Sequence, residues 1–112
     1  DLLVVGVHPD ESVRGLKGAA RPFVPLDQRM RLLAALQCVD YVVPFGESTP
    51  LDLISHLVPN VLVKGGDYTA QDTAGAAEVI AAGGRFAAIP FVHPRSTTEL
   101  IGRIRADAAR ER

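Results

Sequence analysis

Apolar residues recur along this chain in two alternating patterns, short unbroken runs and stretches with helical spacing. Unbroken runs rich in Val and Leu are typical of strands buried on both faces. An apolar residue at every third or fourth position is typical of an amphipathic helix. The runs predict strands at residues 2–7, 41–45, 60–64 and 85–91. The spacing predicts one helix from Pro25 onward and others at 50–57 (capped by Ser48-Thr49-Pro50), 75–82 and 98 to about 110.

The segment between the first strand and the first helix has neither pattern. His8-Pro9-Asp10 is typical of a turn, and the polar residues around Lys17-Gly18 and Arg21-Pro22 predict a loop. Strands that alternate with helices predict an α/β fold with a parallel sheet and right-handed crossovers. In such sheets ligands bind beyond the carboxyl ends of the strands.

Length and charge narrow the classes of function. The chain has 112 residues, which fits one domain, and 47% of them are hydrophobic, as expected of a soluble protein with a core. A net charge of −1 excludes a bulk electrostatic field for nucleic acid or an anionic membrane. No apolar run approaches the length of a membrane span. The single cysteine, Cys38, is predicted to be a small buried hydrophobe in a reducing, cytoplasmic setting.

Arg95, Ser96, Thr97 and Thr98 open the last predicted helix directly after the fourth strand. The first N–H groups of a helix lack intrahelical partners, so a helix start can hold a phosphate. The three hydroxyls and the guanidinium can each donate to phosphate oxygens. The alternative is an ordinary N-cap formed by Ser96 or Thr97 with Glu99 or its neighbours.

Lys64-Gly65-Gly66-Asp67-Tyr68 follows the third predicted strand. The glycine pair allows a positive φ or the close approach of backbone to a ligand. Asp67 can accept a hydrogen bond from a ribose or sugar hydroxyl, and Tyr68 offers a face for stacking. The alternative is a tight turn with an Asx-type hydrogen bond from Asp67.

Other candidates are expected at the same end of the sheet. Lys17 is either a solvated lysine or a mobile cation that closes over phosphates, and Asp10 either binds a sugar hydroxyl or terminates the turn. Arg29 is expected on a solvated helix face, with a structural ion pair near the loop. His8 and His93 lack the spacing of a metal site and are assigned as neither ligands nor bases, and His56 is expected on the surface of a helix.

Eight segments resemble a known family in order and spacing: 7–13, 16–18, 21–22, 25–29, 33–36, 38–40, 62–68 and 95–98. The family is the cytidylyltransferase-like nucleotidyltransferase superfamily, and the resemblance is to its D-glycero-β-D-manno-heptose 1-phosphate adenylyltransferase domain. It extends from residue 1 to about residue 105. It implies a Rossmann-like parallel sheet with helices on both faces.

The resemblance implies nucleotidyl transfer. A sugar 1-phosphate oxygen attacks the α-phosphorus of ATP in line, and an ADP-sugar and pyrophosphate result, usually with Mg²⁺. The implied role of the protein is positioning and charge stabilisation. The resemblance assigns catalytic roles at the phosphates to Lys17, Arg95, Ser96 and Thr97. It assigns nucleotide binding to Lys64, Gly65, Gly66, Asp67, Tyr68 and Thr98, and sugar phosphate binding to Asp10.

Three departures from the family pattern stand out. His8-Pro9-Asp10 replaces the usual Asn-Ser-Asp, which affects the assignment of the acceptor sugar, and Ala77 stands where relatives often have an acid. The family's His-x-Gly-His motif is absent from this sequence. In the family, the strand before that motif lies at the centre of the sheet, between the strands that match residues 2–7 and 61–64. We therefore expect residues 1–112 to be an N-terminally incomplete nucleotidyltransferase domain that is inactive by itself.

The expected partners are small molecules, ATP and a sugar phosphate, with no nucleic acid and no membrane. A homo-oligomer and a fused or separate sugar kinase are both compatible with the resemblance. Two other functions stay open, a cytidylyltransferase for glycerol phosphate or ethanolamine phosphate and a non-catalytic nucleotide-binding remnant. A receiver-like interaction domain is disfavoured, because such a domain needs an acidic cluster and the chain offers only Asp10 at a strand end.

Overall fold

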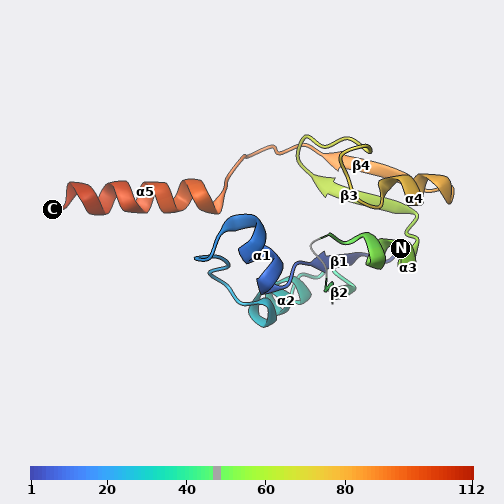
Figure 1. The fold of residues 1–112 in the computed structure, drawn as a ribbon, viewed down its shortest axis with the longest axis horizontal. Helices are drawn as coiled ribbons and strands as arrows, with labels where there is room; N and C mark the ends of the chain where they lie inside the picture. Colours follow the sequence, from blue (N-terminus) through green and yellow to red (C-terminus); the bar gives the residue numbers. More distant parts are fainter. Residues whose placement is uncertain (47–48) are drawn as a thin grey trace.

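The computed structural model describes residues 1–46 and 49–112, and strands alternate with helices as predicted (Figure 1). The predicted end of the fourth strand moves from residue 91 to Ile89, because Pro90 has no N–H to continue the ladder. The predicted cap at Ser48 lies outside the described residues. The elements are β1 (Val4–Val7), α1 (Asp10–Lys17), α2 (Leu26–Ala34), β2 (Tyr41–Pro44), α3 (Leu51–Leu57), β3 (Val61–Gly65), α4 (Ala76–Ala81), β4 (Arg85–Ile89) and α5 (Thr97–Arg110).

The strands pair in parallel but form two separate ribbons. β1 pairs with β2, where Val4 lies opposite Tyr41, and β3 pairs with β4, where Val61 lies opposite Arg85. Within residues 1–46 and 49–112, no ladder joins β1 to β3. The division falls where the resemblance places a further, central strand. The predicted α/β fold with parallel strands is therefore confirmed, and its sheet is open at that position.

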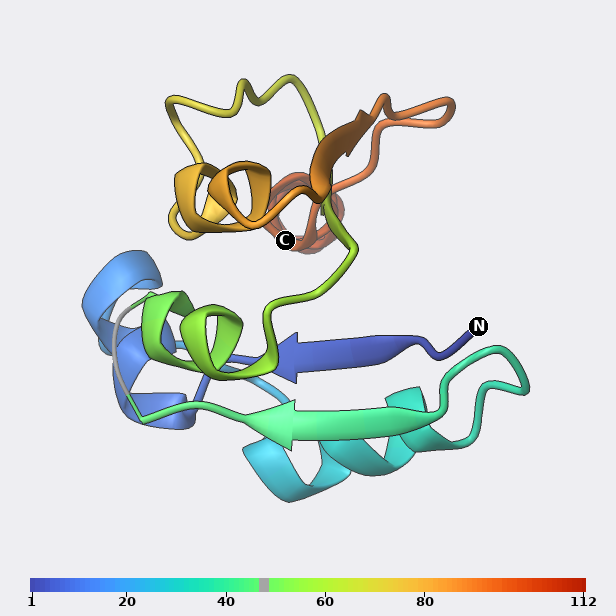
Figure 2. The same cartoon turned by 90° about the vertical axis from the view of Figure 1, so that its right-hand side faces the viewer.

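Helices cover the ribbons and connect them. Figure 2 shows α2 on one side of the β1–β2 ribbon and α3 on the other, while α4 packs on β3 and β4. Leu53 of α3 lies beside Gly6 of β1, and Ile54 of α3 packs against Gly75 at the start of α4. Gly75 has a φ of +86°, and a Cβ there would lie 2.7 Å from Ile54 Cδ1, so only glycine fits. The buried apolar side chains are Val7, Phe45, Ile54, Ala76 and Val79.

The strands on either side of the division carry exposed apolar side chains. Leu3 is 42% exposed and Val63 is 48% exposed, although both belong to runs typical of strands buried on both faces. For the part of the chain that is described, the backbone groups on the outer edges of β1 and β3 have no ladder partner. Open strand edges of this kind favour pairing with a further strand.

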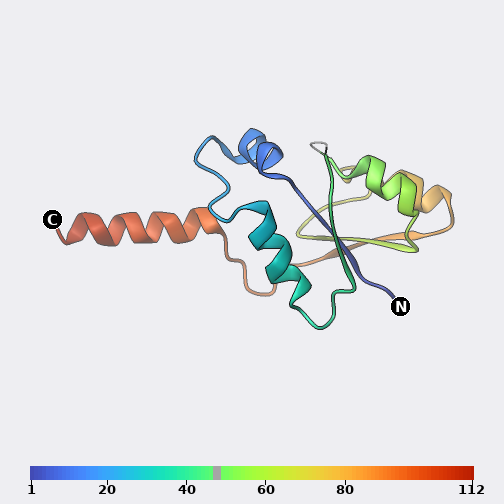
Figure 3. The ribbon, with the colours of Figure 1, turned by 90° about the horizontal axis from the view of Figure 1, so that it is seen from below.

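The last helix, α5, extends away from both ribbons, and the molecule measures 58 Å along its longest axis (Figures 1 and 3). Its first turn is joined to the loop between α1 and α2 by a hydrogen bond from Arg21 to Thr98. The apolar residues Leu100 and Ile104 are exposed, so the apolar face of the amphipathic helix α5 is not packed against the rest of the molecule. Neither α5 nor another helix of the described residues has the length and apolarity that crossing a membrane requires.

Two predictions about local structure are wrong. Residues 10–17, predicted as part of a loop, form α1, and Lys17 lies in its last turn. Pro9 precedes this helix, acidic residues occupy its first turn, and Gly18 ends it with a φ of +104°, all of which favour a short helix. Cys38, predicted to be buried, is exposed because it lies in the turn between α2 and β2 rather than in a packed element.

Candidate functional site

The carboxyl end of β1 carries an ion pair between Asp10 and Arg29. Arg29 Nη2 lies 2.8 Å from Asp10 Oδ1, and Arg29 Nε donates to the Val24 carbonyl at 2.9 Å. The side chain of Arg29 is 22% exposed and that of Asp10 is 32% exposed, so solvent screens the ion pair only in part. Arg29 thus joins the start of α1 to the loop before α2, which confirms its predicted structural ion pair. The second Asp10 oxygen remains able to accept a hydrogen bond.

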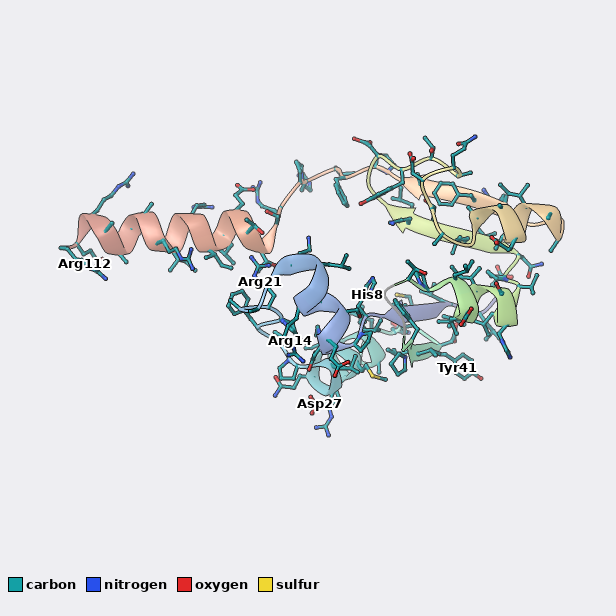
Figure 4. All side chains as sticks on the ribbon, in the orientation of Figure 1. His8, Arg14, Arg21, Asp27, Tyr41 and Arg112 are labelled. Carbon is teal, nitrogen blue, oxygen red and sulfur yellow. The ribbon has the colours of Figure 1, made fainter. Side chains whose placement is uncertain are left out.

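His8, labelled in Figure 4, directly follows β1 and is close enough to Arg29 to be affected by its charge. Its ring packs edge-on against Phe45, with centroids 4.6 Å apart, and its buried Nδ1 has no hydrogen-bond partner among the described residues. Burial lowers the pKa of His8 below its ordinary value of 6.5, and the charges of Arg29 and Lys64 lower it further. The imidazole is therefore neutral at pH 7. His8 was assigned no functional role from the sequence. The one sequence feature that pointed to this residue was that it replaces the Asn of the family motif.

Lys64, Gly65, Gly66 and Tyr68 come together at the end of β3. Lys64 Nζ lies 4.0 Å from the centroid of the Tyr68 ring, a cation–π contact. Gly66 is buried with a φ of +112°, and its N–H donates to the Ile89 carbonyl at 2.8 Å. The predicted positive φ is thus confirmed at Gly66. The rings of Tyr68 and Phe91 lie against the turn. None of the side-chain hydrogen bonds found among the described residues comes from Asp67, so the Asx-type turn is not seen there.

The start of α5 has the N-cap that the sequence offered as the alternative to a phosphate site. Ser96 Oγ accepts a hydrogen bond from the Glu99 N–H at 3.0 Å, which confirms Ser96 as the N-cap. Because that N–H is used, the N–H groups of Thr97 and Thr98 are the helix-start donors that still face outward. A shallow depression of about 440 Å³ lies against this turn. It is lined by Arg95, Ser96, Thr97, Glu99, Leu100 and Arg103.

Arg21 makes a hydrogen bond to the first turn of α5. It was not assigned to the site from the sequence. Its Nη2 donates to Thr98 Oγ1 at 3.2 Å, and its guanidinium lies 5.0 Å from the centroid of the Phe23 ring. Figure 4 places Arg21 where the loop after α1 approaches α5. The one sequence feature that pointed to Arg21 was its place in the segment Lys17–Pro22, part of which resembles the family. A contact across 77 residues depends on the tertiary fold and not on local pattern.

The structure brings together only part of the predicted site. Asp10 lies with His8 and Arg29 at the end of β1, and Lys64 is close enough to affect the protonation of His8. Thr98 lies with Arg21, whereas Lys17 and Asp67 are exposed and make no ion pair within the described ranges. The predicted roles of these residues in catalysis and binding stay predictions.

Comparison with known proteins identifies relatives. The sequence model of a family described as cytidylyltransferase-like matches residues 1–103. The chain is 54% identical over 105 residues to the bifunctional protein HldE of Vibrio atlanticus (strain LGP32), covering 94% of this chain and 22% of that protein. It is 52% identical over 111 residues to the protein of the same name from Geotalea uraniireducens (strain Rf4), covering 99% and 23%. The chain thus spans less than a quarter of these curated relatives.

A solved structure has the same fold. It is the crystal structure of the lipopolysaccharide core biosynthesis protein from Thermoplasma volcanium GSS1, which superimposes with a TM-score of 0.62. The match covers 85% of this chain and 76% of that chain at 17% sequence identity. At that identity the likeness concerns the fold alone.

Proposed function

This chain belongs to the cytidylyltransferase-like family, and we propose that it is the adenylyltransferase part of an enzyme that transfers AMP from ATP to heptose 1-phosphate. The products are ADP-heptose and pyrophosphate. The observation that carries the proposal is the open start of α5, where Arg21 is bound to Thr98 beside the Ser96 cap. The heptose motifs of the sequence and the 54% identity to a protein named HldE support the choice of substrates.

The reaction requires that phosphate charge is held while the α-phosphorus stays open to in-line attack. An oxygen of the sugar phosphate forms the new P–O bond, and the bond to pyrophosphate breaks. The N–H groups of Thr97 and Thr98, with the guanidiniums of Arg21 and Arg95, hold phosphate oxygens at the start of α5. Lys17 adds charge from the last turn of α1. These groups act by positioning and by charge stabilisation.

The acceptor sugar phosphate is assigned to the end of β1. The Asp10 oxygen that is not paired with Arg29 accepts from a sugar hydroxyl, and neutral His8 offers one donor and one acceptor beside it. Lys64 and Asp67, at the end of β3, are assigned to binding the nucleotide. Because His8 replaces the family's Asn, the preference among sugar phosphates is expected to depend on this residue.

Mg²⁺ enters the proposal as part of the substrate, MgATP. Mg²⁺ in nucleotide sites is held mainly by phosphate oxygens, with one or two carboxylates and waters. The exposed carboxylate of Asp67 fits that requirement, and no cluster of three metal-binding side chains occurs in the portion of the chain described. The protein groups therefore suit a cation that arrives with the nucleotide.

The complete domain, in this proposal, contains a further strand between β1 and β3, supplied by a segment of the protein beyond these 112 residues. The open edges and the exposed Leu3 and Val63 support such a strand. The word "bifunctional" in the relatives' name supports a second activity in the same protein, which we assign to a sugar kinase. We assign the enzyme to the cytoplasm because the proposed reaction uses ATP.

The test is an assay of pyrophosphate release with the full-length protein. With heptose 1-phosphate as acceptor, ATP is expected to support turnover and CTP to support far less. Preference for CTP with glycerol phosphate or ethanolamine phosphate would replace the proposal with a cytidylyltransferase. Binding of ATP without turnover on any of these acceptors would indicate a non-catalytic nucleotide-binding module.

A further inference from the structure

Phe91 lies two residues beyond β4, on the carboxyl side of the β3–β4 ribbon, and its ring is held against the backbone of Gly65 and Gly66. A Cβ on Gly65 would lie 3.3 Å from Phe91 Cε1, and a Cβ on Gly66 would lie 3.4 Å from Phe91 Cε2. The distance at Gly65 is shorter than an ordinary contact, and the distance at Gly66 is at the short end of ordinary contacts. The glycine pair therefore allows an aromatic ring to lie closer to this turn than other residues permit.

Phe91 is nevertheless 68% exposed, so a flat apolar surface faces solvent. It differs in position from the exposed Leu3 and Val63, which lie next to the division, because Phe91 follows β4, on the other side of β3. Tyr68, the other aromatic ring at this turn, is 44% exposed and already carries the Lys64 ammonium on its face, 4.0 Å from the centroid. The ring with an uncovered surface is therefore that of Phe91.

We propose that Phe91 is the residue on which the base of the nucleotide stacks, with a purine preferred. This inference rests on the proposed function and adds a base-binding residue to it. Stacking of a base on an aromatic side chain needs a flat, accessible ring and tolerates every base, but a purine covers more of the ring than a pyrimidine. Phe91 supplies that ring, and Lys64 and Asp67, which flank the glycine pair in the sequence, supply the polar groups that a ribose and its phosphates require.

The position of Phe91 relative to the start of α5 agrees with such a ligand. Ser96 is five positions after Phe91, so their Cα atoms can be at most about 18 Å apart. One nucleotide can therefore contact the ring with its base and the helix start with its phosphates. In this arrangement the segment 91–96 follows the nucleotide, and Tyr68 positions Lys64 rather than stacking on the base.

The experiment is isothermal titration of full-length protein with ATP, CTP and inorganic tripolyphosphate, which has the charge of the nucleotide but no base. In F91L the Kd for ATP is expected to rise roughly 10- to 100-fold, while the Kd for tripolyphosphate changes less than about twofold. F91W is expected to restore ATP binding. Y41L removes an exposed aromatic ring from the opposite end of the β1–β2 ribbon and serves as the matched control, with an unchanged Kd for ATP.

Each other outcome overturns a defined part of the argument. Unchanged ATP binding in F91L, or an equal loss of ATP and tripolyphosphate binding in F91L that F91W does not rescue, overturns the stacking role and leaves the proposed function in place. A wild-type protein that binds tripolyphosphate as tightly as ATP also excludes a base-binding surface. A wild-type protein that binds none of the three ligands overturns the proposed function together with this inference.

Discussion

Arg21 and Thr98 are joined by a hydrogen bond of 3.2 Å, although they are 77 positions apart in the sequence. This bond connects the loop after α1 to the first turn of α5, which otherwise extends away from the ribbons. The Phe23 ring lies 5.0 Å from the guanidinium and limits its movement. A cation is thus held at the helix start where the phosphates of the nucleotide are proposed to bind.

Replacement of Arg21 is expected to weaken catalysis in the full-length enzyme. R21A removes a guanidinium from the phosphate site, and loss of a charge-assisted hydrogen bond should lower kcat/KM for ATP about 10- to 100-fold. T98V keeps the volume but removes the acceptor and should give a smaller loss, about two- to tenfold. Steady-state kinetics of pyrophosphate release measures both. R31A, on an exposed position of α2, is the control, and equal activity of R21A and R31A would contradict the role of Arg21.

The ion pair between Arg29 and Asp10 is expected to stabilise α1 locally. R29M removes both the contact with Asp10 and the hydrogen bond to the Val24 carbonyl, so α1 should open more easily by about 1–2 kcal/mol. Hydrogen exchange of the amides at 10–17, followed by mass spectrometry, should therefore become roughly 5- to 30-fold faster. R29K should retain part of the protection through the Asp10 contact. Exchange in R29M at the wild-type rate would show that the pair contributes nothing to α1.

His8 is expected to make stability depend on pH. Because its folded pKa lies below 6.5, the unfolded chain binds more protons in the interval between the two values, and stability increases as pH rises through it. The contribution is complete above about pH 6.5 and is lost as pH falls through the folded pKa. The melting temperature of wild-type protein should thus fall more steeply below pH 6.5 than that of H8Q. A ring-proton NMR titration that gives His8 a pKa at or above 6.5 would contradict this prediction.

The sequence predicted the fold well where apolar periodicity was strong, and it failed where local signals were weak. The strand at β3 was expected at 60–64 and lies at 61–65, and the last helix was expected from Thr98 and begins at Thr97. α1 was missed because it is short, polar overall and contains a glycine, although Val13 and Leu16 lie at helical spacing. Short polar helices depend on their caps and on tertiary contacts such as the Arg29 ion pair.

The candidate site could be predicted from the sequence only where a residue's role depends on its local sequence. Ser96 was recognised because an N-cap is a local feature, and Gly66 because a positive φ depends on residue type. Arg21 and His8 could not be assigned from the sequence, because their environments come from residues distant along the chain. Phe91 was interpreted as the end of a strand, and its exposure became visible only once Pro90 had ended β4.

The open edges of β1 and β3 predict a difference in hydrogen exchange between full-length protein and the 112-residue chain. In a parallel ladder successive residues face alternate edges. Leu3 faces β2, since its carbonyl accepts from the Tyr41 N–H at 3.1 Å, so Val4 and Gly6 face the division. Asn60 faces β4, since its carbonyl accepts from the Arg85 N–H at 3.0 Å. By the same alternation Val61 and Val63 also face the division.

The amides of Val4, Gly6, Val61 and Val63 should be protected in the full-length protein and exchange rapidly in the 112-residue chain, because a further strand would pair with them. The amide of Leu62 faces β4 and is the internal control, with similar protection in both proteins. Residue-resolved exchange by NMR measures this difference. A second comparison is activity, which the full-length protein should have and the short chain should lack. Rapid exchange of the four amides in full-length protein would contradict a strand at this position, because those groups would then be open to water in both forms.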